Sequence, residues 1–223
     1  MTRRMIPILV FGLAGTAVLV ALCLWQLRRL EWKEAILDRI ETRLALAPGA
    51  LPDSPDEAED IYRPVRLTGR IVAGRELHVL TSAKPGGPGF RVIAPFETAA
   101  GRLILIDRGY VPEAEKALAR ATGPAAITGN LHWPDETDSF TPDPNLERNI
   151  WFARDVAAMA RALDTEPVLV VVRDTSLPGA RALPVSVDIP NDHLQYALTW
   201  AALACVWLVM TGVWLLRIHR RTA

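Results

Sequence analysis

His193 is the residue whose surroundings most favour chemistry. It lies at the start of a long uncharged stretch, and Asp192 and Gln195 beside it have the spacing of a capping box. This spacing predicts that His193 is the first residue of a helix, where the helix dipole disfavours a positively charged imidazolium. Neutral imidazole is the form that ligates metal ions. One interpretation is therefore a metal ligand, and the other is a polar residue at the level of the lipid headgroups.

The rest of the sequence offers no catalytic constellation. His78 and His132 stand alone, without the spacing of a zinc site, and no G-x-S-x-G nucleophile motif is present. The glycine-rich residues 84–89 lack the spacing of a phosphate-binding loop. The two cysteines, Cys23 and Cys205, lie in uncharged stretches at depths that would differ by roughly 10 Å, too far for a disulfide. We therefore expect a protein that is not an enzyme.

Two long uncharged stretches, one of which follows His193, lie near the ends of the chain. Residues 5–27 and 194–216 each comprise 23 residues, enough to span roughly 34 Å as a helix. They predict transmembrane helices at 5–27 and 193–216, with an amphipathic extension of the first helix to about residue 47. The first stretch is longer than the apolar region of a signal peptide and lacks its cleavage site, so we expect an uncleaved anchor.

One face of the second predicted helix is suited to packing. A stripe on this face is made of His193 and the tryptophans that follow it at seven-residue steps, Trp200, Trp207 and Trp214. Trp207 lies near the middle of the bilayer, away from the interfaces at which tryptophans gather. It therefore needs a packing partner, which could be small residues of the first helix such as Gly12 and Gly15, another protein or a cofactor ring.

Basic residues predict the orientation in the membrane. A basic cluster at 217–221 follows the second stretch, and Arg3 and Arg4 precede the first. Both termini are therefore expected in the cytoplasm and the middle of the chain outside it. Arg28 and Arg29 then lie on the disfavoured outer side, which suggests a local role for them. The formal net charge of zero gives no indication of nucleic acid as a partner.

Residues 48–190 predict one β-rich domain. An acidic, proline-rich linker begins it, and runs of β-branched and aromatic residues predict strands at 62–71, 76–82, 90–98, 102–111 and 167–175. A loop with a short helix is expected at 111–125, an acidic loop at 135–149, and a helix capped by Asp155 that ends near residue 163. The fold class is an α+β membrane protein, with two transmembrane helices flanking a mainly antiparallel β domain or small barrel with one or two short helices.

Four short motifs, taken in order, resemble those of one family. They are LWQLRRLEWK at 24–33, DRGYVP at 107–112, a Phe-x-Pro-Asp-x-Asn run with Trp-Phe and Asp after it at 140–155, and NDHLQYALTW at 191–200. Within a frame of two membrane helices, they resemble the surfeit locus protein 1 family of Shy-type cytochrome c oxidase assembly factors. Gln195 departs from many relatives, which carry a different residue there. The resemblance covers the whole chain.

The resemblance implies a respiratory chain biogenesis factor that binds haem a and assists its insertion into the catalytic subunit of cytochrome c oxidase, a haem–copper oxidase. His193 would be the iron ligand. The first predicted span begins at residue 5 without an Arg/Ser-rich transit peptide, so a bacterial inner membrane and a periplasmic domain are expected. The oxidase catalytic subunit and the lipid bilayer are the expected partners, and the enzyme that synthesises haem a is a further candidate.

Further residues are candidates from their depth in the membrane or their place in these motifs. Arg28 and Arg29 lie at the depth of His193 and are candidates to pair with haem propionates, with Trp200 nearby. Partner contacts are expected at Trp25, Gln26, Asp107, Arg108, Tyr110 and Trp207. A structural ion pair and turn is the alternative for Asp107 and Arg108. Two other functions stay open: a cofactor-free scaffold for oxidase assembly intermediates, and a membrane-anchored enzyme that acts on haem or quinol.

Overall fold

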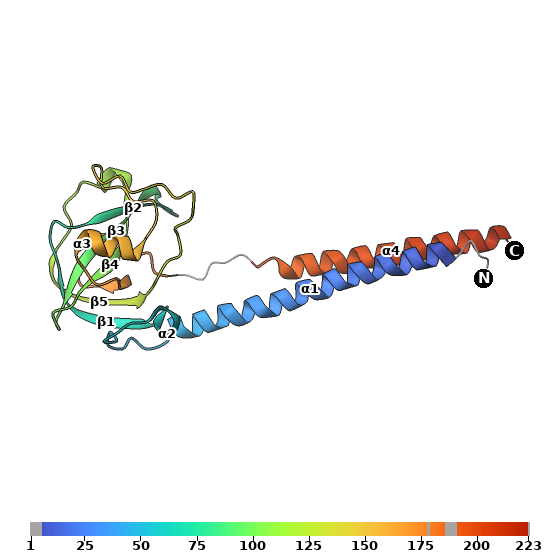
Figure 1. Ribbon diagram of the computed structural model, residues 1–223, viewed down its shortest axis with the longest axis horizontal. Helices are drawn as coiled ribbons and strands as arrows, with labels where there is room; N and C mark the ends of the chain where they lie inside the picture. Colours follow the sequence, from blue (N-terminus) through green and yellow to red (C-terminus); the bar gives the residue numbers. More distant parts are fainter. Residues whose placement is uncertain (1–5, 178, 186–190, 223) are drawn as a thin grey trace. The chain divides into compact units, whose positions relative to one another are not determined.

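The computed structural model describes residues 6–177, 179–185 and 191–222 (Figure 1). Contacts divide the chain into two compact units. One contains residues 1–39 and 187–223, and the other contains residues 40–186. The first unit is helical, and the second contains the sheet.

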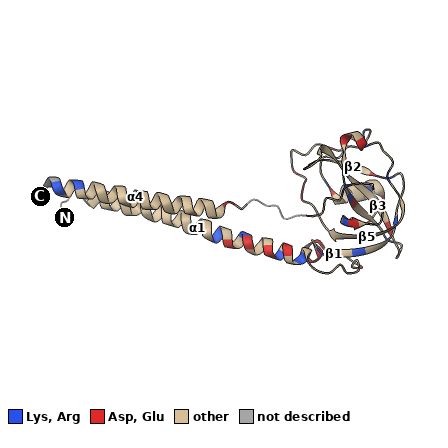
Figure 2. Ribbon diagram, turned by 180° about the vertical axis from the view of Figure 1, so that it is seen from behind, with Lys and Arg blue, Asp and Glu red and all other residues tan. Residues whose placement is uncertain are grey.

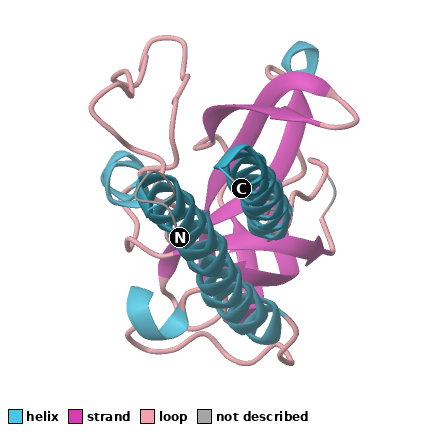
Figure 3. Ribbon diagram, turned by 90° about the vertical axis from the view of Figure 1, so that its right-hand side faces the viewer, coloured by secondary structure: helices cyan, strands magenta, loops and turns pink. Residues whose placement is uncertain are grey.

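Two long helices form the first unit. They are α1 (Ile6–Leu44), whose last residues belong to the second unit, and α4 (His193–Thr222), and they run side by side (Figures 1 and 3). Their most apolar windows have mean hydropathies of 2.5 and 1.9, so both are long and apolar enough to cross a membrane. Within these two helices, the charged residues lie in the later part of α1 and at the end of α4 (Figure 2). Two apolar helices at the two ends of the chain confirm that part of the predicted fold class.

Small residues let the two helices approach closely. Ala197 and Ala204 are buried on the predicted packing face of α4. A methyl group added at Gly15 would lie 2.5 Å from Trp207 Nε1, and one added at Gly12 would overlap the side chain of Thr211. The close approach therefore depends on glycine at both positions.

The second unit is built on one six-stranded sheet. Its strands are β1 (Pro64–Ile71), β2 (Leu77–Ala83), β3 (Gly87–Thr98), β4 (Leu103–Pro112), β5 (Gly123–Leu131) and β6 (Leu169–Thr175). Their order is β1-β5-β6-β4-β3-β2, and an additional pairing of β1 with β3 closes five strands into a ring. All pairs are antiparallel except β4 with β6, which confirms the predicted mainly antiparallel domain. Figure 3 shows these strands in magenta.

The core follows from the alternation of side chains along the strands. On β4, Ile104 and Ile106 pack with the main cluster, which contains residues of β1, β3, β5 and β6. Leu105 between them belongs to a second cluster, which contains Met159 and Leu163 of α3 (Val156–Leu163). The helix α3 therefore covers the opposite side of β4. The sheet that results is buried on both faces at this strand.

Local features match the sequence in some places and depart from it in others. Asp155 Oδ1 accepts a hydrogen bond of 2.9 Å from Ala158 N–H, so the predicted cap of α3 is confirmed. A short helix η1 (Glu113–Glu115) lies where one was expected. The sequence does not predict β5, whose glycine, proline and alanine residues have weak strand propensity. It also does not predict α2 (Glu57–Asp60) in the acidic linker, which Asp56 caps.

Candidate functional site

A histidine–amide pair joins the two long helices. His193 is the first residue of α4, as predicted, and Tyr196 N–H donates to Asp192 O over 3.1 Å in the first helical turn. His193 Nδ1 lies 2.8 Å from Oε1 of Gln26 on α1. Gln26 is only 8% exposed, so its side chain is buried where it contacts His193. Because an amide oxygen can only accept, Nδ1–H is the donor in this contact, and in the neutral tautomer Nε2 carries the free lone pair.

This pair has the donor chemistry of a haem ligand. Metal-ligating histidines commonly donate the other ring N–H to an oxygen acceptor, which fixes the tautomer and the orientation of the ring. Among the described residues, no group of three or more His, Cys, Asp or Glu is arranged to hold a metal ion. A single imidazole fits a metal whose other ligands come with it, as in haem.

Arg28, Arg29 and Trp200, the other predicted cofactor-binding residues, lie at different positions relative to the histidine–amide pair. Helical steps of about 100° place Arg29 roughly 60° from Gln26 around α1, and Arg28 roughly 160° from it. Both arginines are exposed, and the Arg29 guanidinium lies 4.2 Å from the centre of the Trp32 ring. Trp200 is half-buried on α4, roughly 10 Å along the helix from His193. Arg29 is therefore better placed than Arg28 for a group bound at His193.

The tryptophan stripe is a packing surface for most of its length. Trp207 Nε1–H donates to Gly12 O over 3.0 Å, and its ring centre lies 5.3 Å from that of Phe11. The packing partner that Trp207 needs is thus the first helix of the same chain. The prediction of Trp207 as a partner-binding residue gains no support from this contact. Trp214 departs from the stripe, because it is 54% exposed.

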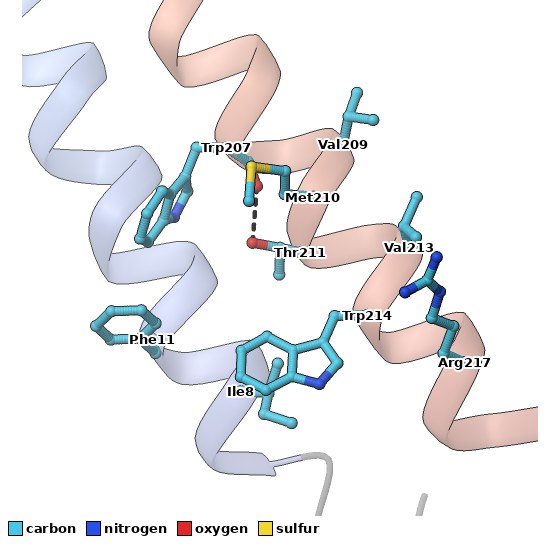
Figure 4. A pocket seen from close by; sticks show the side chains of 9 residues that line it. All are labelled: Ile8, Phe11, Trp207, Val209, Met210, Thr211, Val213, Trp214 and Arg217. Atoms are coloured by element: carbon cyan, nitrogen blue, oxygen red, sulfur yellow. Dashed lines mark hydrogen bonds between the residues drawn. The ribbon is translucent and has the colours of Figure 1, made fainter. Parts of the chain in front are cut away.

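An apolar groove of about 490 Å³ lies between the start of α1 and the later part of α4 (Figure 4). Its lining residues are Ile8, Phe11, Trp207, Val209, Met210, Thr211, Val213, Trp214 and Arg217. Trp207 comes 14 residues after His193 on α4, a distance of roughly 21 Å along the helix axis. The groove is therefore separate from the histidine–amide pair.

The residues predicted to contact a partner from the β domain lie inside it. Asp107 is completely buried, and its carboxylate is 2.7 Å from Arg91 Nη1 and 3.3 Å from Arg154 Nη1. Arg108 is 5% exposed and pairs with Glu76. Their exposure gives no support to a partner-binding role, and the alternative of a structural ion pair and turn describes them.

Tyr110 is likewise part of the domain interior. It is 3% exposed, and its O–H donates to Gly86 O over 2.9 Å. Trp25 on α1, by contrast, is 56% exposed and keeps its prediction as a partner contact. Gln26, predicted to bind a partner, instead lies against His193.

The two histidines of the β domain both have lowered pKa values. Burial, followed by the positive charge of Arg120, lowers the pKa of His78 to about 4. Burial and then Arg154 lower the pKa of His132 to about 4. Both imidazoles are neutral at ordinary pH. His78 is held between Arg120 Nη2 at 2.9 Å and Asn149 Nδ2 at 3.2 Å.

Comparison with known proteins identifies the family. A model of the SURF1 family matches residues 13–205, a range that includes both Gln26 and His193. The chain belongs to the SURF1 family. It is 31% identical to human Surfeit locus protein 1 over 227 residues, covering 90% of this chain and 72% of the human protein. It is also 31% identical to a SURF1-like protein of Monosiga brevicollis, covering 92% and 83% of the two chains.

Another relative, Surfeit locus protein 1 of Gallus gallus, is 32% identical over 85% of this chain and 71% of its own length. These matches confirm the resemblance read from the motifs. Membership of the SURF1 family implies an assembly factor for cytochrome c oxidase. Sequence reasoning missed the bond between Gln26 and His193, although an amide at the end of an otherwise apolar stretch was a visible signal.

Proposed function

We propose that this SURF1 protein binds haem a through His193 Nε2 and assists its insertion into the catalytic subunit of cytochrome c oxidase. The observation that carries the proposal is the 2.8 Å contact between His193 Nδ1 and Gln26 Oε1, which leaves Nε2 as the basic nitrogen. When bound, the haem would supply an iron atom that a neutral imidazole can ligate, and His193 would hold it. The protein binds and orients the haem and performs no catalytic step on it.

The position of His193 also suits an amphipathic porphyrin. It begins α4 at the boundary between polar residues and the apolar part of the helix. A porphyrin ring in the apolar layer would leave its propionates at the polar boundary. Arg29, on nearly the same side of α1 as Gln26, would then pair with a propionate, and Arg28 would contribute less. We expect Arg29→Gln to weaken haem binding more than Arg28→Gln, measured by haem titration.

The proposed location is a bacterial inner membrane with two passes. Arg217 and Arg220 end α4, and basic residues of short loops lie preferentially in the cytoplasm. Both termini would be cytoplasmic and residues 40–186 periplasmic. The oxidase catalytic subunit is the proposed recipient of the haem. The enzyme that synthesises haem a is the proposed donor.

A reduced-minus-oxidised spectrum tests this function. The full chain would be purified from cells that make haem a, as wild type, as His193→Ala and as His219→Ala. His219 is a matched control on the same helix, 26 residues later, which corresponds to roughly 39 Å. We expect a stoichiometric haem a band in wild type and in His219→Ala, and none in His193→Ala. Wild type without a band would refute the proposal and favour a cofactor-free scaffold.

A further inference from the structure

The β domain carries a long connection that is ordered without being a helix or strand. Residues 132–155 join β5 to α3. Connections of this length are uncommon in compact domains, and those that exist are either disordered or functional. Bonds to the rest of the domain hold both ends of the segment 135–149, which we call the acidic loop.

The start of the acidic loop is tied to a buried ion pair. Arg154 N–H donates to Glu136 Oε2 over 2.9 Å, and the Arg154 guanidinium also pairs with this carboxylate. Arg154 in turn pairs with the fully buried Asp107. Hydrogen bonds from Arg154 and its positive charge lower the pKa of Glu136 against the opposing effect of burial, so this carboxylate stays ionised. Glu136 is thereby anchored to the core of the domain.

The end of the acidic loop is tied to β2. Asn149 Nδ2–H donates to Glu76 O over 2.7 Å, and Leu80 N–H donates to Trp151 O over 2.8 Å. Lys116 Nζ donates to Arg148 O over 2.6 Å. With both ends fixed, the path of the loop between them is constrained, as in a compact Ω-type loop.

The middle of the loop holds a phenyl ring in solvent. Asp138 Oδ1 accepts hydrogen bonds from Phe140 N–H, at 2.9 Å, and from the Thr141 hydroxyl, at 3.0 Å. Phe140 is 90% exposed, and Leu146 is 73% exposed. An aromatic side chain that an anchored loop holds in solvent is of the residue kind that dominates the energetics of protein interfaces, so Phe140 is a candidate contact for a partner. Anchoring the loop in advance reduces the entropy lost when that partner binds.

The charge of the loop selects the kind of partner. Residues 135–149 contain five carboxylates and one arginine. The surface of a bilayer that contains anionic lipids repels such a loop. A protein pocket that is apolar inside and basic at its rim complements both the phenyl ring and the carboxylates. The loop therefore favours a protein over a lipid surface.

We infer that Phe140 and Leu146 of the acidic loop dock into a pocket on the oxidase catalytic subunit. This pocket is apolar inside and basic at its rim. The inference rests on the proposed function, which supplies the identity of the partner. It assigns docking to the loop and leaves haem ligation to His193. The two roles use residues of different compact units.

Affinity measurements with point variants test the inference. The probe is the purified oxidase catalytic subunit in detergent, titrated with the full chain as wild type, as Phe140→Ala and as Leu118→Ala. Leu118 is a matched control, because it is 59% exposed in the segment that follows η1 and lies outside the acidic loop. We expect Phe140→Ala to weaken binding about 30-fold, as for a central interface residue. Leu118→Ala should leave the affinity unchanged.

A crosslinker at the same positions identifies the occupant of the loop. Benzoylphenylalanine would replace Phe140 or Leu118 in the full chain, expressed in membranes together with the oxidase. A crosslink from position 140 to the catalytic subunit, absent from position 118, supports the inference. Crosslinks from position 140 to lipid or to another part of the same chain overturn it, as does unchanged affinity of Phe140→Ala.

Failure of the docking inference differs from failure of the proposed function. If Phe140→Ala binds the catalytic subunit as wild type does while the purified chain keeps its haem a band, the loop assignment is wrong and the function stands. If wild type carries no haem a, the proposed function is wrong whatever the loop binds. Equal thermal unfolding of wild type and Phe140→Ala, measured in the same detergent, shows that the variant is folded.

Discussion

Replacement of Gln26 by leucine should weaken the proposed haem binding while keeping His193, the proposed iron ligand. Gln26→Leu nearly conserves the side-chain volume but removes the oxygen that accepts from His193 Nδ1–H at 2.8 Å. A buried hydrogen bond of this kind contributes about 1 kcal/mol, and an unpaired buried donor costs about 1–3 kcal/mol. The loss of such a partner typically reduces metal affinity about 10- to 100-fold. We expect the haem a dissociation constant to rise about 10-fold, equivalent to about 1.4 kcal/mol.

The redox potential provides an independent measure of the same bond. Donation from Nδ1–H to an oxygen raises the basicity of the imidazole, which favours oxidised iron. Gln26→Leu should therefore raise the midpoint potential of the bound haem. If the bond distinguishes the two oxidation states by about 1 kcal/mol, the change is about 40 mV for a one-electron couple. Spectroelectrochemical titration of the purified protein measures it.

Thr16→Val is the matched control for Gln26→Leu. Thr16 lies on the same helix, and its hydroxyl donates only to Gly12 O over 2.8 Å. It is ten residues before Gln26, so the substitution also replaces a polar group in an apolar stretch without touching the site. If Gln26→Leu leaves both the haem affinity and the midpoint potential at wild-type values, the assignment of Gln26 as the partner that orients His193 is refuted.

Three further predictions concern packing and stability. Gly15→Leu should separate the two long helices and abolish the haem band. Gly212→Ala should leave the band unchanged, because a methyl group at 212 meets open space. Reduced-minus-oxidised spectra of both variants measure this. Asp107→Ala should destabilise the β domain by about 3–5 kcal/mol in urea unfolding, since Arg91 and Arg154 each lose a fully buried carboxylate partner, while Glu97→Gln in an exposed ion pair should cost less than about 1 kcal/mol. The pKa of His132 is lowered to about 4 in the folded domain, against about 6.5 when unfolded. The unfolded state therefore binds more protons between these values, so stability should be complete above about pH 6.5 and fall toward pH 4, with a flatter profile in His132→Asn.

Local signals predicted much of the fold, and contacts distant in sequence account for what was missed. The strand β4 and the helix α3 follow from runs of β-branched residues and from the Asp155 cap, which act within a few residues. The strand β5 has few such residues, and its conformation depends on pairing with β1 on one side and β6 on the other. Strand propensity alone could not locate it, because those partners lie far along the chain.

The candidate site divides in the same way. The position of His193 at the start of α4 follows from the residues next to it. Its partner, Gln26, is 167 residues away in sequence, so only the packing of α1 on α4 brings the two together. Asp107 shows a different limit: its motif leaves two interpretations open, a partner contact or a structural ion pair, and only the structure shows the carboxylate fully buried between two arginines. Charge alone did not distinguish an exposed motif from an internal ion pair.

The construction of the site suits a protein that gives its haem away. A haem that stays with its protein is commonly held by a closed pocket, often with a second axial ligand. In the described part of the chain, the site offers one imidazole at the edge of a two-helix pair, oriented by a single hydrogen bond. A recipient that provides a closed pocket and further ligation binds the same haem more tightly, so transfer is favourable without another source of energy. An imidazole oriented by one hydrogen bond would thus suit the proposed carrier, and the bond to Gln26 should then have a large effect on affinity.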